Sequence, residues 1–347
     1  MKSSSELFPT QLIKADVIEN LSSRFAEDVY LIKPGNSNDH SVQLAVTNLS
    51  RFEEESIEKK SDKKRWWHSP AKATENLRSR SVILVHGCYQ NKNLWFSPHH
   101  KDLIDQLLDK GYDVWLMEHR GHGLSPVNQS YDHNTLEDYA QYDIPAVNDF
   151  VTEQTNSKPH WIGYGEGAGS LLLSLASGSI TENALSSVTG IGSPFLSIPM
   201  SRLPLSHILA QPFNRLQKNA SRRGPESEPW ALRKQLLKEG GWLTQRGSNL
   251  GIDLWQELIS QNFPLRWLAS PIDLNKLDEG LATLFASGKL DLLDCSLSWG
   301  ALAPENVHTT MLDTRDVEHI FHLLTDKLEG FVQKNGLLLS GKTSTTI

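Results

Sequence analysis

The sequence predicts an α/β fold in which helices flank a mostly parallel, doubly wound sheet. Short apolar runs typical of buried strands alternate with segments of helical spacing over the first half of the 347-residue chain. One of these runs passes through a glycine-rich turn, 163–167, directly into an apolar helix. Strand character lapses from about 195 to 280 and then returns. A structureless loop of that length would be improbable, so the lapse predicts an inserted helical unit.

The composition excludes several classes of protein. The formal net charge is −7 and the dense basic run is mixed with acid, so we expect no nucleic-acid partner. Two cysteines, Cys88 and Cys295, form no disulfide framework and fit a reducing compartment. No signal-peptide core follows the polar first residues, and no stretch reaches the roughly 18 apolar residues that span a bilayer. We therefore expect a soluble, cytoplasmic protein without a cofactor, for which peripheral contact with lipid stays open.

The first elements predict a leading hairpin. A short helix is expected near Ser3, and strands are expected at Asp28–Ile32 and Ser41–Val46, joined by the turn residues 33–39. Residues 53–72 begin with an acidic and then a basic run that has almost no apolar residues. Such a run is typical of a solvated excursion rather than of a recognition patch.

The alternating elements that follow predict the body of the sheet. Buried strands are expected at Ser81–Val85, Asp113–Glu118, Trp161–Ile162 and Val188–Ile191. Helices are expected over Leu103–Gly111, from a cap at Thr135 through Val151, and from Leu171 onward. Pro145 predicts a kink or a break in the second of these helices.

The chain is expected to divide into a core and an inserted cap. Residues 1–194 and 281–347 form the two parts of the core, and 195–280 form a helical cap over the active edge of the sheet. Within the cap, helices are expected at Trp230–Leu237, Leu254–Ile259 and Leu265–Leu268. Core strands return at Leu281–Ala286 and Val307–Leu312, before a closing helix at Ile320–Val332. Four cap tryptophans fit either an apolar ligand cavity or simple packing on the core: Trp230, Trp242, Trp255 and Trp267.

The glycine-rich turn has the pattern of a nucleophile elbow from which the nucleophile is missing. In the G-x-S-x-G pattern the middle residue is a serine that attacks an ester, whereas this chain has Gly165 there. The backbone N–H groups that stabilise an oxyanion would come from Glu166 and from the turn His86, Gly87 and Cys88. A carboxylate at position 166 would oppose developing negative charge unless its side chain points away.

A base and an orienting acid are expected later in the chain. Folds of this kind present the nucleophile first, then Asp or Glu, then His. We expect Asp291 to be the acid, in a loop after the Leu281–Ala286 strand, and His319 to be the base, in a loop before the last helix. Rival residues are Asp294 and Asp316 for the acid and His308 and His322 for the base.

Other residues are weaker candidates for chemistry. Ser170 would already face elsewhere on the helix, and Cys88 is more simply a buried, inert thiol. Five histidines between 86 and 122 have no carboxylate or cysteine at ligand spacing, so we expect no metal site.

The sequence resembles the acid lipase and cholesteryl esterase branch of the α/β-hydrolase family from about Val82 to Leu173. The residues that carry the likeness are Leu84-Val85-His86-Gly87 with Trp95, Gly111–Leu116, Arg120-Gly121, Tyr142–Phe150 and His160–Tyr164. Those enzymes hydrolyse lipid esters with a serine nucleophile. The resemblance therefore implies an α/β-hydrolase fold and a small apolar ester or lipid-like ligand. A looser resemblance is to the non-catalytic NDRG proteins, whose elbow also reads Gly-x-Gly-x-Gly.

Three hypotheses about function follow. The chain could hydrolyse acyl esters weakly, with water activated by His319 and Asp291 in the space that the missing side chain leaves. It could instead be a pseudo-hydrolase that binds an apolar ligand or a protein partner. The third is a deliberate serine-to-glycine replacement in an active esterase, which the sequence alone does not separate from natural loss.

Overall fold

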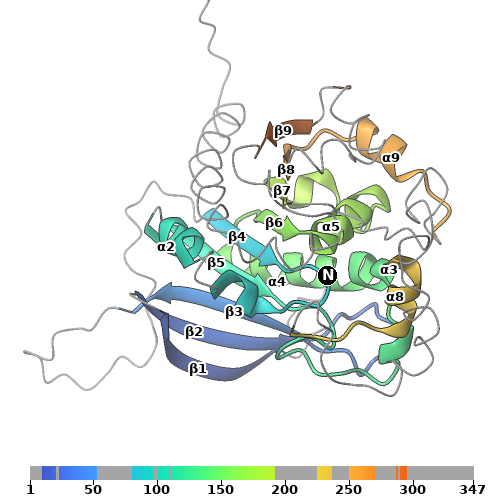
Figure 1. Cartoon of the computed structure of the whole chain (residues 1–347). Helices are drawn as coiled ribbons and strands as arrows, with labels where there is room; N and C mark the ends of the chain where they lie inside the picture. The colour runs from blue at the N-terminus through green and yellow to red at the C-terminus, as the bar shows by residue number, and fades with distance from the viewer. Residues whose placement is uncertain are drawn as a thin grey trace, which may run out of the picture.

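The computed structural model describes residues 10–20, 23–52, 80–96, 101–109, 111–191, 225–236, 250–269, 287 and 290–294. Within this part of the chain, nine strands form one sheet in the order β1-β2-β3-β5-β4-β6-β7-β8-β9 (Figure 1). The strands are β1 (Gln11–Asn20), β2 (Ser23–Ile32), β3 (Leu44–Arg51), β4 (Arg80–Val85), β5 (Tyr112–Met117), β6 (His160–Tyr164), β7 (Ser187–Ile191), β8 (Leu265–Ala269) and β9 (Leu290–Asp294).

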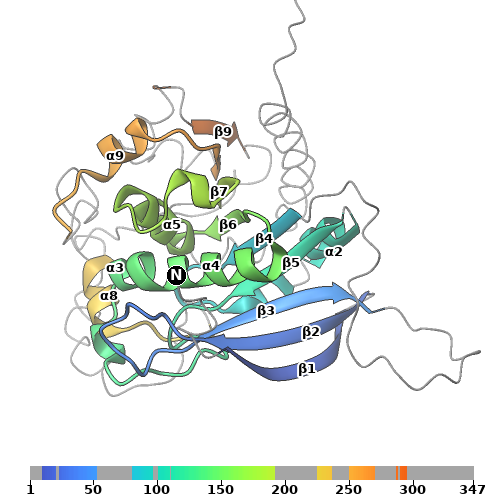
Figure 2. The same cartoon turned by 180° about the vertical axis from the view of Figure 1, so that it is seen from behind.

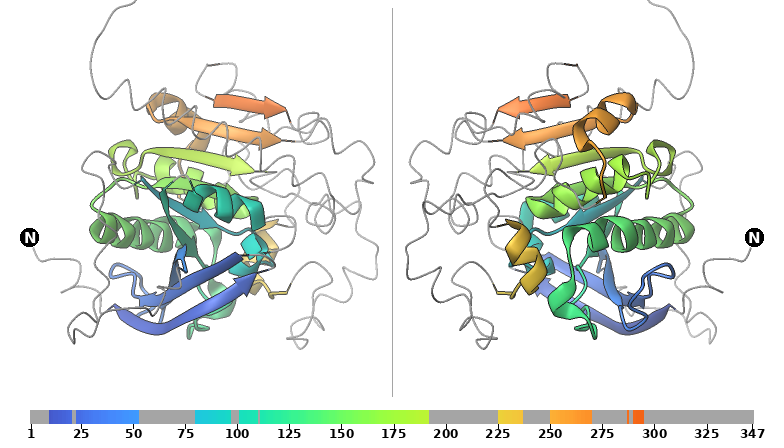
Figure 3. Two further views of the ribbon diagram at one scale, coloured as in Figure 1. Left: turned by 90° about the vertical axis from the view of Figure 1, so that its left-hand side faces the viewer. Right: turned by 90° about the vertical axis from the view of Figure 1, so that its right-hand side faces the viewer.

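The sheet is antiparallel at one end and parallel over the rest. β1, β2, β3 and β5 pair antiparallel, whereas β5, β4, β6, β7, β8 and β9 pair parallel. The predicted leading hairpin and the predicted parallel body are therefore confirmed. Strand direction turns progressively from β1 to β9, as the twist of a large sheet requires (Figure 3).

Helices cover both faces of the sheet. The described helical segments are η1 (Lys92–Phe96), α2 (Lys101–Asp109), η2 (Tyr131–His133), α3 (Leu136–Asp138), η3 (Tyr139–Asp143), α4 (Ile144–Thr155), α5 (Glu166–Ala176), η4 (Glu182–Ala184), α8 (Trp230–Leu236) and α9 (Leu254–Ser260). One core cluster packs α4, α5 and α9 against residues such as Ile83 and Val188, and Figure 2 shows α4 and α5 in front of the sheet. A second cluster packs α2 and η1 against the other face, through residues such as Val82 and Leu84.

The break expected at Pro145 lies where the helix changes its winding. Thr135 caps α3 in a capping box with Asp138. One π-helical turn, η3, follows, and α4 then begins at Ile144 with Pro145 in its first turn, where a missing N–H costs nothing.

Two expectations about local structure are wrong. The short helix expected near Ser3 is not one of them, because it lies outside the described residues, and the chain that follows forms β1. The run Leu265–Leu268 was expected to be a helix, but it forms β8 and pairs with β7 and β9. Asp291 was expected in a loop, but it lies inside β9, opposite Arg266. By periodicity, the short apolar run at 265 fits a helix and a buried strand equally well. It forms a strand here because its backbone pairs with the edge of β7.

The expected cap is described only in part. The helices expected at 230 and 254 are confirmed as α8 and α9, and the sheet resumes at 265, before the expected end of the insertion at 280. Trp267 is fully buried in β8 and Trp255 is buried on α9, so packing accounts for both, whereas Trp230 is half-buried and Trp242 lies outside the described residues. Several other predicted features also lie outside: the excursion 53–72, the strands at 281 and 307, the last helix, His308, Asp316, His319 and His322.

Candidate active site

The turn between β6 and α5 has the backbone of a nucleophile elbow. Gly165 lies between them with φ +53° and ψ −124°, a conformation that glycine adopts without a Cβ clash. Its N–H donates to the carbonyl of Ile191 on β7 at 2.9 Å, and its carbonyl accepts from Gly169 N at 3.1 Å. The turn is therefore held by the neighbouring strand and by the first turn of α5, and its tip has no side chain.

The two outer glycines of the elbow allow close contact between elements. A Cβ at Gly163 would lie 2.6 Å from Cα of Ala168, and one at Gly167 would lie 2.3 Å from the carbonyl oxygen of His86. Both values are shorter than a real Cβ contact, so the helix α5 can approach β6 and the turn after β4 only with glycine at these positions. The pattern Gly163-x-Gly165-x-Gly167 is thus explained by packing at its ends and by the turn at its centre.

The turn after β4 lies against the elbow. His86 is fully buried, its Nδ1 donates to the carbonyl of Gly87 at 2.8 Å, and its Nε2 accepts from His119 N at 3.3 Å. Burial lowers the pKa of His86 to about 3, so the ring is neutral and its two nitrogens keep these fixed roles. His86 orients the turn and has no nitrogen left for proton transfer.

The side chain of Glu166 points into the site. Its Oε2 accepts a hydrogen bond from Cys88 N at 3.2 Å. Glu166 is 7% exposed, and burial raises the pKa of its carboxyl to about 7 against the lowering effect of the backbone N–H groups of Glu166 and Cys88. The sequence analysis predicted that this carboxylate would oppose an oxyanion unless it pointed away from the oxyanion donors. It does not point away from them.

A carboxylate from outside the elbow also reaches the site. Glu228, 3% exposed, accepts from the backbone N–H of Tyr89 and lies 3.1 Å from Nε2 of His122. Burial alone would lower the pKa of His122, but Glu228 raises it; burial alone would raise the pKa of Glu228, but His122 lowers it. The two therefore form a buried hydrogen-bonded pair beside the turn, in which each group stabilises the charged form of the other.

Residues 225–229, here called the strap, hold Glu228 in place. Glu226 N donates to the carbonyl of Tyr89 at 3.1 Å, and Glu226 Oε1 accepts from Asn91 Nδ2 at 2.5 Å and from Gly123 N at 3.3 Å. Tyr131 donates its hydroxyl to the carbonyl of Ser227. Sequence reasoning missed the strap, because nothing in the spacing of Pro225-Glu226-Ser227-Glu228-Pro229 shows which loop it meets.

The alternative nucleophiles are both in inert settings. Ser170 is fully buried and donates its hydroxyl to the carbonyl of Gly167 at 2.8 Å. Burial, together with the carboxylates of Glu166 and Glu228, raises the pKa of the Cys88 thiol well above its ordinary value, which keeps it protonated. Among the described residues no group of three or more His, Cys, Asp or Glu could hold a metal ion.

The predicted acid and base stand differently. Asp291 lies on β9 and its side chain is not described, while the rival Asp294 ends that strand, at the carboxyl edge of the sheet. Since ligands of such sheets bind beyond the carboxyl ends of the strands, Asp294 is the better placed of the two by backbone position. The roles of Asp291 and His319 stay predictions.

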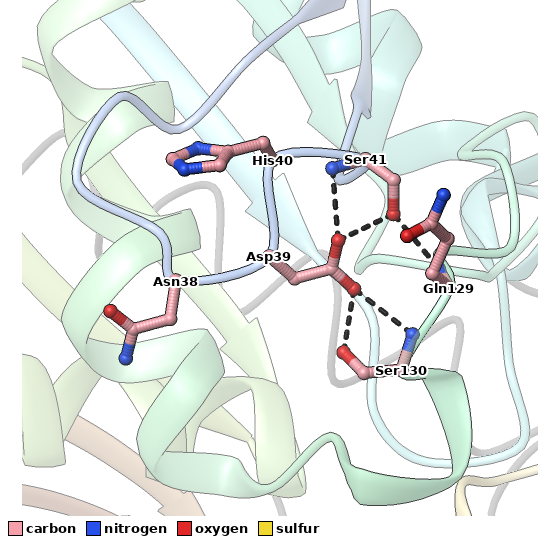
Figure 4. A pocket seen from close by; sticks show the side chains of 6 residues that line it. All are labelled: Asn38, Asp39, His40, Ser41, Gln129 and Ser130. Carbon is pink, nitrogen blue, oxygen red and sulfur yellow. Dashed lines mark hydrogen bonds between the residues drawn. The ribbon is translucent and has the colours of Figure 1, made fainter.

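A polar hollow of about 710 Å³ lies elsewhere in the described structure and shares no residue with the elbow. It is lined by Asn38, Asp39, His40, Ser41, Gln129 and Ser130 (Figure 4). The Asp39 carboxylate accepts from the backbone and side chain of both Ser41 and Ser130 and from Asn128, so its lone pairs are occupied. The hollow thus marks a junction between two loops.

Comparison with known proteins agrees with this geometry. Residues 80–228 match the model of the α/β-hydrolase fold family, and this match contains the turn after β4, the elbow and all of the strap except its last residue. This part of the chain has the α/β-hydrolase fold. Two solved structures show the same fold: a structure from a study of carboxylesterases of Nitrososphaera gargenis and a haloalkane dehalogenase variant from Bradyrhizobium elkanii. The first has a TM-score of 0.52 at 15% identity and covers 88% of this chain and 99% of that one. The second has a TM-score of 0.51 at 11% identity and covers 93% and 99%.

Curated proteins with local sequence similarity to this chain include lipases. The chain is 33% identical over 104 residues to gastric triacylglycerol lipase of Rattus norvegicus, a match that covers 27% of this chain and 26% of that enzyme. It is 28% identical over 120 residues to a probable lipase of Schizosaccharomyces pombe, covering 32% and 26%. The chain thus spans about a quarter of the length of the curated relatives it matches. Among the described residues no helix has the length and apolarity to cross a bilayer.

Proposed function

We propose that this chain is a lipase- and esterase-like α/β-hydrolase that hydrolyses apolar acyl esters weakly at most. The observation that carries the proposal is Gly165, which has the backbone conformation of the nucleophile elbow and no atom that can attack an ester. Ser170 and Cys88 do not replace it, because one is bonded to its own helix and the other is held as a thiol. Any remaining hydrolysis would use water activated by His319 and Asp291, in agreement with the first sequence hypothesis.

A second candidate function is binding without catalysis. The buried carboxylates of Glu166 and Glu228 accept hydrogen bonds from the backbone N–H groups of Cys88 and Tyr89 in the turn after β4. Carboxylates on these donors would also suit a pseudo-hydrolase that holds a lipid-like ligand or a protein partner. The side chain at position 166 also speaks against a single deliberate replacement of a serine, because restoring that serine leaves the carboxylate in place. A cytoplasmic location, inferred from the two cysteines, stays a prediction.

Steady-state hydrolysis of p-nitrophenyl butyrate and p-nitrophenyl palmitate tests the proposal. Loss of a triad serine costs about 10⁶-fold in kcat, and a typical kcat is about 10 s⁻¹, so we expect about 10⁻⁵ s⁻¹ from the unaltered chain. His319→Ala is the matched control. This variant loses the remaining hydrolytic activity if His319 activates water, and keeps the same activity if the chain only binds its ligand. A kcat of about 1 s⁻¹ or more would show that a nucleophile operates and would refute the proposal.

A further inference from the structure

One of the two backbone donors of the α/β-hydrolase site already has an acceptor. Cys88 N, in the turn after β4, donates to Glu166 Oε2 at 3.2 Å. The N–H of Glu166, first residue of α5, lies near the same carboxylate and lowers its pKa. In an acyl-transferring member of this fold, the N–H after the nucleophile and one from the strand-to-helix turn bind the oxygen on which negative charge develops.

A carboxylate reproduces what those donors are built to receive. An ionised carboxylate oxygen and the oxygen of a tetrahedral intermediate are both anionic acceptors, and both draw N–H groups into short hydrogen bonds. The carbonyl oxygen of an incoming substrate would have to displace the Glu166 carboxylate. This carboxylate belongs to the protein itself, and its negative charge would repel the negative charge that develops on the substrate oxygen. Removing one oxyanion donor alone costs about 10²- to 10³-fold in kcat, so a competing anion on the Cys88 donor should have a cost of the same order.

The surrounding residues keep the Glu166 carboxylate in this position. A Cβ built on Gly87 would lie 3.4 Å from Glu166 Oε2, so the carboxylate rests against the glycine of the turn. The titratable groups that face it are the Cys88 thiol and Glu228, and Glu228 is itself paired with His122. Glu228, on the strap side, repels the Glu166 carboxylate because the two groups carry like charge. The Glu166 carboxylate is therefore more stable when it points toward the backbone N–H groups.

We propose that Glu166 is an internal occupant of the oxyanion site, so that its carboxylate closes the site to acyl transfer independently of the missing nucleophile. The proposal rests on the proposed function, because it assigns the Cys88 and Glu166 N–H groups to the oxyanion site. It makes Glu166 the second residue, after Gly165, that separates this chain from an active esterase.

The contact itself can be tested without any activity. The chain has two cysteines, so selective ¹⁵N-cysteine labelling gives two amide resonances, and Cys295→Ser assigns the one from Cys88. We expect the Cys88 amide proton to shift as pH passes through about 7, where the pKa of Glu166 lies, and to lose this shift in Glu166→Gln. Glu228→Gln is the control, in which the shift persists with a moved midpoint. A Cys88 amide that is insensitive to pH in the unaltered chain, or identical in Glu166→Gln at every pH, overturns the proposal.

A second test measures the effect on chemistry. Gly165→Ser and the double variant Gly165→Ser/Glu166→Ala are compared for modification by a fluorophosphonate and for hydrolysis of p-nitrophenyl butyrate, with circular dichroism to verify folding. We expect the double variant to react at least about 100-fold faster than the single variant. Equal rates in two active variants refute the role of Glu166. Two silent variants contradict the proposal's claim that removing Glu166 opens the site, while the Cys88 resonance still reports whether the contact forms. Rapid hydrolysis by the unaltered chain would instead refute the proposed function.

Discussion

Replacing Arg120 by methionine is expected to lower the free energy of unfolding by about 3–5 kcal/mol. Arg120 follows β5 and is 2% exposed, and its partner Asp143, at the end of η3, is fully buried. Arg120 Nε donates to the two carboxylate oxygens at 3.1 and 2.9 Å, and Nη2 donates to Oδ1 at 2.5 Å. Burial raises the pKa of Asp143 although Arg120 opposes it, so without Arg120 the carboxylate would be buried and unpaired.

Urea denaturation of three variants separates this pair from an ordinary ion pair. Arg51→Met, which breaks ion pairs with the exposed Asp109 and the partly buried Asp105, should cost about 1 kcal/mol or less, because Arg51 itself is a third exposed. The double variant Arg120→Met/Asp143→Leu should recover most of the loss, because no charge then stays buried. A cost below about 1 kcal/mol for Arg120→Met would show that the pair does not anchor the loop after β5 to the helix that follows η3.

Replacing Glu166 by glutamine is expected to stabilise the fold at pH 8 and to change it little at pH 4.5. Burial raises the pKa of Glu166 from 4.5 to about 7, so between these values the folded state binds more protons than the unfolded state. Stability contributed by this group is therefore lost as pH rises from about 4.5 to about 7. The difference between these two pKa values corresponds to about 3 kcal/mol in the free energy of unfolding. Glutamine does not lose this stability at high pH, because it has no charge to desolvate.

The measurement is the free energy of unfolding of both chains in urea at pH 4.5 and pH 8. Any packing cost of glutamine is the same at the two pH values, so the change in the difference between the chains isolates the titration. We expect Glu166→Gln to gain about 3 kcal/mol relative to the unaltered chain between pH 4.5 and pH 8. A difference that stays constant with pH would mean that the Glu166 carboxyl is not held in a buried site.

Most of the sheet could be predicted because each strand signal is local. The runs at 81, 113, 161 and 188 are short and mostly apolar, and each is followed by a glycine turn or a helical pattern. The elbow could be predicted because its glycine spacing is also a local pattern. The structure explains the two outer glycines by close contacts to Ala168 and to the carbonyl of His86. The run at 265 failed because its length and composition fit both a helix and a strand, and only the partner strands β7 and β9 decide.

The electrostatics of the site could be predicted only in part. Sequence reasoning identified the risk that Glu166 poses to an oxyanion, but not the direction of its side chain, which depends on the turn after β4 lying against α5. Glu228 could not be predicted at all, since it is 106 residues from His122 in the chain and reaches it through the strap. Asp291 was assigned from chain order, and its position within β9 shows that order does not fix where along a strand an acid stands.

The elbow of this chain keeps its backbone conformation, and Gly165 places no nucleophile at its tip. Intact-mass measurement after incubation of the unaltered chain with a fluorophosphonate tests this most directly, because the reagent adds only to an activated nucleophile. We expect no adduct, and we expect p-nitrophenyl butyrate to be hydrolysed at a rate close to that of buffer. A stoichiometric adduct on the unaltered chain, mapped by peptide mass spectrometry to any serine such as Ser170, would contradict it.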